Sequence, residues 1–156
     1  MKKVFALLAI SALLLTGCGE KEVSTSSDNL PTVTTNQGEA PTIGAPSGTP
    51  PTTLVTKDII VGTGAEALPT STMTVHYTLM TWSNGQLIES SWNGGSPATF
   101  PLANVIVGWQ QGIPGMKVGG RRLLVIPPDL GYGAQGGGPI GPNETLIFVV
   151  DAIGVA

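Results

Sequence analysis

The sequence predicts an α+β domain of short antiparallel strands with one short helix. From residue 54 to residue 156, apolar or alternating segments are separated by turns rich in glycine and proline, a pattern typical of antiparallel strands. Only one segment, around residues 108–113, is a candidate helix, and Pro114-Gly115 ends it. About 100 residues are enough for one two-layer domain of this class.

The first half of the domain contains two expected strands and a hairpin. LVTKDIIVGTG, residues 54–64, is extended and stops at its glycines. MTVHYTLM, residues 73–80, alternates, which places its odd-numbered residues on one face. Asn84-Gly85 predicts a type I′ turn, which requires positive φ at both residues, and QLIESSW is then the returning strand.

The second half contains two apolar strands, RRLLVI at 121–126 and TLIFVVDAI at 145–153. Both are apolar on both faces, as expected for central strands. We expect one face to pack on the helix. The other face requires a cover, either the first strand or a partner.

The first 17 residues have the features of a secretion signal. Two lysines precede the apolar run VFALLAISALLL, and small residues lead to LTGC at 15–18. A transmembrane anchor is the alternative, but the 16 uncharged residues between Lys3 and Glu20 fall short of the roughly 20 that a spanning helix needs. We expect residues 1–17 to be a signal peptide.

Cys18 is the only cysteine in the chain, and we expect it to carry lipid. LTGC is similar to the lipobox of bacterial lipoproteins, whose cysteine receives acyl chains such as palmitate. A lone free thiol would otherwise be a liability in an exported protein. Gly19 rather than aspartate follows, so the resemblance favours the outer membrane in a Gram-negative host and the cell membrane otherwise.

The segment after Cys18 predicts a linker. Ser, Thr, Pro and Gly make up 21 of the 35 residues from 19 to 53. Such a segment buries too little apolar surface to offset its ordering entropy. We therefore expect residues 18–53 to be a lipidated, disordered linker and residues 54–156 to be the domain. A glycosylated stalk is the alternative.

Charge and composition exclude several functions. From Cys18 onward, five basic and ten acidic residues give a formal net charge of −5, which repels nucleic acid. His76 is the only histidine and the carboxylates are scattered, so we expect His76 to be structural and neither a metal nor a cofactor to be bound. No segment has the pattern of a dimerisation helix, so a monomer is expected.

One glycine-rich stretch, GYGAQG at 131–136, matches the G-x-G-x-x-G spacing of nucleotide-binding loops. That motif works only where the glycines follow a strand and open a helix. Pro139 and Pro142 make such a helix start implausible. The glycines therefore predict a tight loop rather than a phosphate cradle.

Four blocks, in this order and spacing, resemble the FKBP family of peptidyl-prolyl cis/trans isomerases over nearly all of residues 54–156. They are VHYT at 75–78, NGQLIESS at 84–91, VIVGWQQGIPGMKVGGRRLLVIPPDLGYG at 105–133 and TLIFVVDAI at 145–153. The resemblance implies a twisted antiparallel sheet wrapped around one short helix, with an apolar pocket between them.

The resemblance also implies a role for each pocket residue. Trp109 would form the floor under a proline ring, the backbone N–H of Ile106 would bond a substrate carbonyl, and Tyr132 would offer its hydroxyl. The remaining matches are Tyr77, Glu89 and Phe148 as catalytic residues and Ile88, Val105 and Ile140 as substrate-binding residues. Plain core packing is the alternative explanation of these side chains.

Three departures from the family pattern bear on activity. Ile88-Glu89 stands where Phe-Asp is usual, so an aromatic wall is lost and the carboxylate has a longer arm. Ala98 stands where another pocket aromatic is common, and Leu79 replaces a glycine. From these differences we expect a wider pocket with reduced or altered isomerase activity.

The resemblance implies an isomerase that acts on X-Pro bonds of exported proteins and assists their folding from a lipid anchor on the cell envelope. Rotation of the amide breaks no bond, so an apolar pocket with a few fixed donors suffices. Proline-containing polypeptides and macrolides are the implied ligands. A catalytically weak binding or chaperone module is the alternative, and a passive lipoprotein is a third.

Overall fold

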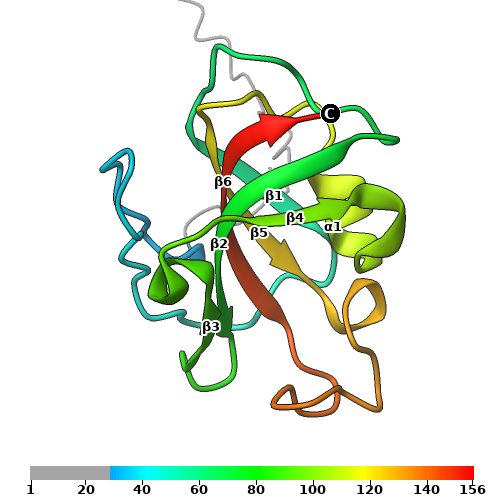
Figure 1. Ribbon diagram of the computed structural model, residues 1–156. Helices are drawn as coiled ribbons and strands as arrows, with labels where there is room; N and C mark the ends of the chain where they lie inside the picture. Colours follow the sequence, from blue (N-terminus) through cyan, green and yellow to red (C-terminus); the bar gives the residue numbers. More distant parts are fainter. Residues whose placement is uncertain (1–28) are drawn as a thin grey trace, which may run out of the picture.

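The computed structural model describes residues 29–156, so the expected signal peptide and Cys18 lie outside the described residues. Over these described residues, six antiparallel strands form one twisted sheet, and a single short helix lies against it (Figure 1). The strand order is β1-β5-β6-β2-β3, and β4 pairs with β2 beyond this path. The predicted α+β class is confirmed.

The strands are β1 (Val55–Ile60), β2 (Thr72–Thr81), β3 (Leu87–Ser90), β4 (Ala98–Pro101), β5 (Arg121–Ile126) and β6 (Leu146–Val155). Three short 3₁₀ turns connect them: η2 (Ser91–Gly94), η3 (Leu102–Asn104) and η4 (Pro128–Leu130). The helix α1 (Val107–Gly112) lies between β4 and β5, one residue earlier than predicted.

Glycines let α1 lie directly on the sheet. A Cβ at Gly108 would lie 2.5 Å from Cγ2 of Ile126, and one at Gly112 would lie 2.6 Å from Cδ2 of Leu124. Side chains at these positions would hold the helix off β5. Close packing therefore explains why a helix forms here despite the low helix propensity of glycine.

The central strands β5 and β6 are buried on both faces, as their apolar runs predict. On one face, Leu124, Phe148 and Val150 pack with Trp109 of α1. On the other, a second cluster contains Leu123, Val125, Ile147 and Val149, together with Met80 and Trp82. We call the first the helix face and the second the outer face.

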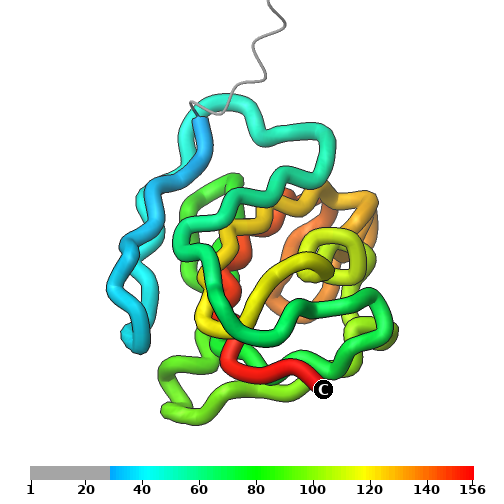
Figure 2. Tube along the Cα trace, turned by 90° about the horizontal axis from the view of Figure 1, so that it is seen from above, coloured from blue at the N-terminus to red at the C-terminus, as the bar shows by residue number. Residues whose placement is uncertain are grey.

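Residues 29–46, which we call the N-terminal arm, cover the outer face. Leu30, Val33 and Ile43 of the arm pack against the second cluster, and Val33 pairs with Ile43 in an antiparallel bridge. Figure 2 shows the blue arm along one side of the sheet, with the yellow-green helix on the other. Over residues 29–46 the structure therefore differs from the expected disordered linker, and the arm supplies much of the cover predicted for this face.

Arg121 explains why so polar a segment is ordered. Its side chain is fully buried, and its Nε donates to Oδ1 of Asp151 at 2.7 Å. Its two terminal nitrogens donate to the backbone carbonyls of Thr34 and Glu39, at 2.9 and 2.7 Å. One guanidinium thus donates a hydrogen bond to each of two arm carbonyls. The composition of the arm does not indicate this hydrogen-bond partner.

The hairpin between β2 and β3 differs from the type I′ prediction. Gly85 has a φ of 63°, but Asn84 has no positive φ. The N–H of Gly85 donates to the carbonyl of Thr81 at 3.0 Å, while Oδ1 of Asn84 accepts from the Thr81 hydroxyl and from the N–H of Gln86. The Asn84 side chain stabilises a longer loop, so positive φ is needed only at Gly85.

Candidate active site

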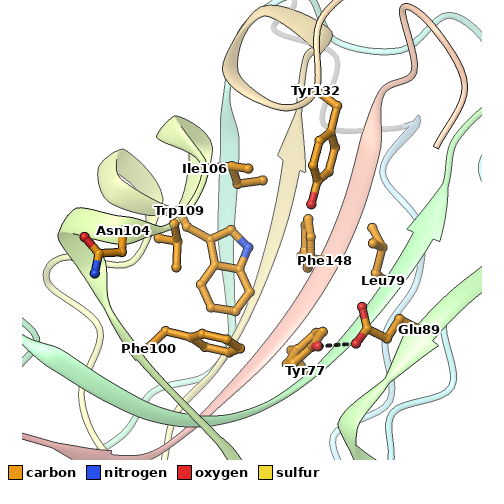
Figure 3. A pocket seen from close by; sticks show the side chains of 10 residues that line it. Tyr77, Leu79, Glu89, Phe100, Asn104, Ile106, Trp109, Tyr132 and Phe148 are labelled. Carbon is orange, nitrogen blue, oxygen red and sulfur yellow. Dashed lines mark hydrogen bonds between the residues drawn. The ribbon is translucent and has the colours of Figure 1, made fainter. Parts of the chain in front are cut away.

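A cavity of about 280 Å³ opens on the helix face, between α1 and the strands β2, β3, β4 and β6 (Figure 3). Its lining is largely apolar, with a few polar groups near the mouth. The lining residues are Tyr77, Leu79, Glu89, Phe100, Asn104, Val105, Ile106, Trp109, Tyr132 and Phe148.

Trp109 forms the floor of the cavity. Its ring meets Tyr77, Phe100 and Phe148 edge to face, with centroid distances of 5.8, 5.9 and 5.3 Å. Each such pair contributes about 0.5–1.5 kcal/mol beyond its buried area. Three neighbours on three strands therefore hold the indole in one orientation, and its buried Nε1 has no partner among the described residues.

A short hydrogen bond joins two strands at one side of the cavity. The hydroxyl of Tyr77 on β2 donates to Oε1 of Glu89 on β3 at 2.6 Å (Figure 3). Burial, followed by the hydrogen bond and the charge of Glu89, raises the pKa of Tyr77 far above its ordinary value. Tyr77 therefore keeps its proton and remains a donor over the whole neutral and mildly alkaline range.

The start of α1 supplies a backbone donor. The carbonyl of Ile106 accepts from the N–H groups of Trp109 and Gln110, at 2.9 and 3.2 Å. Nε2 of Gln110 in turn donates to the carbonyl of Val105 at 2.8 Å and fixes the preceding turn. Within residues 29–156 the N–H of Ile106 donates to no other group, so it is available to a ligand.

The loop of residues 131–142, which we call the flap, places Tyr132 at the mouth. Tyr132 is 41% exposed, and its hydroxyl points toward the cavity (Figure 3). Gly133 and Gly136 have φ angles of 64° and 69°, and the N–H of Gly137 donates to the carbonyl of Ile140. No helix follows these glycines, so the loop lacks the geometry of a phosphate cradle.

The structure brings seven of the nine predicted pocket residues to the cavity lining. The two exceptions are Ile88, which packs against the core, and Ile140, a flap residue that is 5% exposed and belongs to the core cluster. The prediction missed Leu79, Asn104 and Phe100 as lining residues. Phe100 lies two residues after Ala98 on β4 and therefore on the same strand face, which is a signal that alternation could have supplied.

Phe100 also changes the expectation of a missing aromatic wall. Its ring lies 6.0 Å from that of Tyr77 and 5.9 Å from that of Trp109. The cavity therefore has an aromatic group on this side even though Ala98 and Ile88 contribute none. The longer arm of Glu89 likewise reaches Tyr77 at full hydrogen-bond strength.

His76 lies outside the cavity, as its place on β2 predicts. Its ring stacks on Trp92 at a centroid distance of 3.9 Å, and Nδ1 lies 3.0 Å from the hydroxyl of Ser91. Across residues 29–156 no three His, Cys, Asp or Glu side chains gather as a metal site would require. In the same range no helix is long and apolar enough to cross a membrane.

The fold, the Trp109 floor and the Tyr77–Glu89 pair define a protein class. Residues 64–153 match the family model described as FKBP-type peptidyl-prolyl cis-trans isomerase, and the chain belongs to this family. Its function is therefore peptidyl-prolyl cis/trans isomerisation, which needs no covalent intermediate.

Two similar proteins and one similar solved structure agree with this family assignment. The chain is 50% identical over 115 residues to a probable FK506-binding protein of Corynebacterium glutamicum, covering 74% of this chain and 98% of the relative. It is 43% identical over 106 residues to the outer membrane protein MIP of Legionella longbeachae, covering 67% of this chain and 45% of that one. The crystal structure of AtFKBP13 is similar with a TM-score of 0.61 and 39% identity, covering 66% of this chain and 93% of the other.

Proposed function

We propose that this isomerase acts on X-Pro bonds of exported proteins from a lipid anchor at the cell envelope. The observation that carries the catalytic part is the Trp109-floored cavity, in which a protonated Tyr77 and an available N–H of Ile106 face an apolar space. The N-terminal sequence LTGC supports the anchor.

Each pocket group has a role in the proposed mechanism. The proline ring packs on Trp109 and against Phe148, and Val105 contacts the chain beside it. The N–H of Ile106 bonds a substrate carbonyl, and the hydroxyl of Tyr132 bonds the peptide from the flap. Because the site excludes water that favours the planar, charge-separated amide, the twisted transition state is stabilised relative to the ground state.

The arm shortens the proposed tether. Only ten residues, 19–28, separate Cys18 from the first described residue. At roughly 3.3–3.6 Å per residue they reach at most about 33–36 Å. The arm packs on the outer face of the sheet (Figure 2). The cavity, in contrast, opens on the helix face. This arrangement supports an orientation in which the mouth of the pocket points away from the point of attachment.

The catalytic proposal is tested by cis/trans exchange in a proline peptide, followed by NMR. We expect acceleration by the purified protein, a large loss in Trp109→Leu, a smaller loss in Tyr132→Phe, and inhibition by a macrolide such as FK506. Peptide binding without acceleration would instead support the binding-module alternative.

The anchor is tested separately. Cys18→Ala removes the acceptor of the lipid and leaves the described domain unchanged. We expect the unsubstituted protein in the membrane fraction of an expressing bacterium and the variant in the soluble fraction. An equal distribution of the two proteins would contradict the anchor without affecting the catalytic proposal.

A further inference from the structure

Among residues 29–156, Glu89 is the only charged residue that lines the cavity. Its Oε1 accepts the hydroxyl of Tyr77, while Oε2 accepts no hydrogen bond from the residues that the structure describes. Figure 3 shows the carboxylate at the side of the cavity, next to Tyr77 and Leu79. One oxygen of an exposed carboxylate is therefore open to a ligand.

The cations of the described chain lie elsewhere. Three of its four basic side chains pair with other carboxylates: Lys117 with Glu66, Arg121 with Asp151, and Arg122 with Asp58. The fourth, Lys57, lies on β1, at the opposite end of the strand order from the β3 strand that carries Glu89. Within residues 29–156 no cation neutralises the charge of Glu89.

We propose that Glu89 makes this isomerase select proline sites that have lysine or arginine directly beside the proline. The inference rests on the proposed function and deepens it by naming the substrate class. With the proline ring on Trp109, the Tyr77 hydroxyl connects the floor to the carboxylate, so a long cationic side chain next to the proline reaches Oε2. A glutamate at the same substrate position is repelled.

The size of the preference follows from the exposure of Glu89. Exposed ion pairs contribute about 0.2–1 kcal/mol, which corresponds to a factor of about 1.5 to 5 in kcat/KM. Salt screens such a pair, because the Debye length falls from about 10 Å at 0.1 M to about 3 Å at 1 M. The preference for lysine therefore falls as the salt concentration rises.

The test compares three peptides that differ only in the residue beside the proline, which is lysine, norleucine or glutamate. One series varies the residue before the proline and a second varies the residue after it. In at least one series we expect a lysine-to-norleucine ratio of kcat/KM of about 1.5 to 5 and a glutamate-to-norleucine ratio below one. In Glu89→Gln both ratios approach one, and because each is taken within one protein, any general loss of activity in the variant cancels.

Asp129→Asn is the matched control. It removes the same charge from an exposed position on η4, before the flap and outside the cavity lining. We expect it to leave the lysine-to-norleucine ratio unchanged, and an equal fall in both variants would overturn the assignment to Glu89. If the unsubstituted protein accelerates all peptides but its lysine-to-norleucine ratio of kcat/KM is one, this inference alone is overturned. Acceleration of no peptide overturns the proposed function as well.

Discussion

Replacing Arg121 with methionine removes the group that joins the N-terminal arm to the sheet. Methionine has a similar length but no charge or donor. The change leaves the carboxylate of Asp151 buried, with 6% of its residue surface exposed, and already without a partner for Oδ2. It also frees the carbonyls of Thr34 and Glu39 in the arm. We expect the variant to be strongly destabilised and the arm to detach before the domain unfolds.

The expected magnitude comes from the uncompensated carboxylate. Removing one partner of a buried ion pair costs about 3–5 kcal/mol, about a fifth or more of the roughly 5–15 kcal/mol that stabilises an ordinary domain. With a urea m-value of about 2 kcal/mol/M, the midpoint of unfolding falls by about 2 M.

The stability that Arg121→Met loses depends on pH, and the direction of this dependence follows from the pKa of Asp151. Burial is the largest influence on Asp151 and raises its pKa, while Arg121 opposes the rise. Without Arg121 the pKa rises further. A carboxyl with a folded-state pKa above its unfolded value contributes stability at low pH that is lost as the pH rises through the folded-state pKa. The deficit of Arg121→Met is therefore smaller at about pH 5 than at about pH 7.

Urea unfolding followed by tryptophan fluorescence measures this loss, and amide hydrogen exchange reports the arm. Lys57→Met, on the exposed edge strand β1, is the control and should change stability by less than about 0.5 kcal/mol. A change of less than about 0.5 kcal/mol in the unfolding free energy of Arg121→Met, or arm amides as protected as in the unsubstituted protein, would refute the role of Arg121 in holding the arm.

Three further predictions concern the helix face. Phe100→Ala removes two aromatic pairs and should cost about 1–3 kcal/mol in unfolding free energy, with a raised KM for proline peptides; an unchanged KM would remove Phe100 from the substrate wall. Because the pKa of Tyr77 is raised, Tyr77 stays protonated, and we expect no fall in kcat/KM with a midpoint near the ordinary pKa of tyrosine. A fall at that pH that disappears in Tyr77→Phe would contradict this expectation. Gly108→Ala places a Cβ 2.5 Å from Ile126, so it should reduce the free energy of unfolding by about 1–3 kcal/mol and lower the midpoint of thermal unfolding. A stabilised variant would show that helix propensity outweighs packing at this position.

Sequence patterns predicted the domain because local signals and tertiary packing agree there. The alternation of β2 places Tyr77 and Leu79 on the helix face, and Pro114-Gly115 ends the helix near where it was expected. Double-sided apolar strands predicted that both sheet faces are covered. In each case the residue types that favour the element also form its buried contacts.

The arm escaped prediction because its order depends on contacts distant in sequence. Its three apolar side chains pack on a cluster of distant residues, and two of its backbone carbonyls accept from Arg121, 87 and 82 positions away. The composition of the segment does not indicate these partners. The Asn84-Gly85 turn failed for a related reason, since a side-chain hydrogen bond replaced the expected backbone geometry. Phe100 escaped prediction because no strand was expected at residues 98–101, where β4 places it on the same face as Ala98.

Catalysed cis/trans exchange tests the central claim most directly. We expect the purified protein to accelerate exchange of a Leu-Pro peptide, and Trp109→Leu to reduce kcat/KM by at least about tenfold, equivalent to about 1.4 kcal/mol, while circular dichroism confirms that the variant is folded. No acceleration by the unsubstituted protein, or equal acceleration by a folded Trp109→Leu, would contradict the assignment of the cavity as the isomerase site.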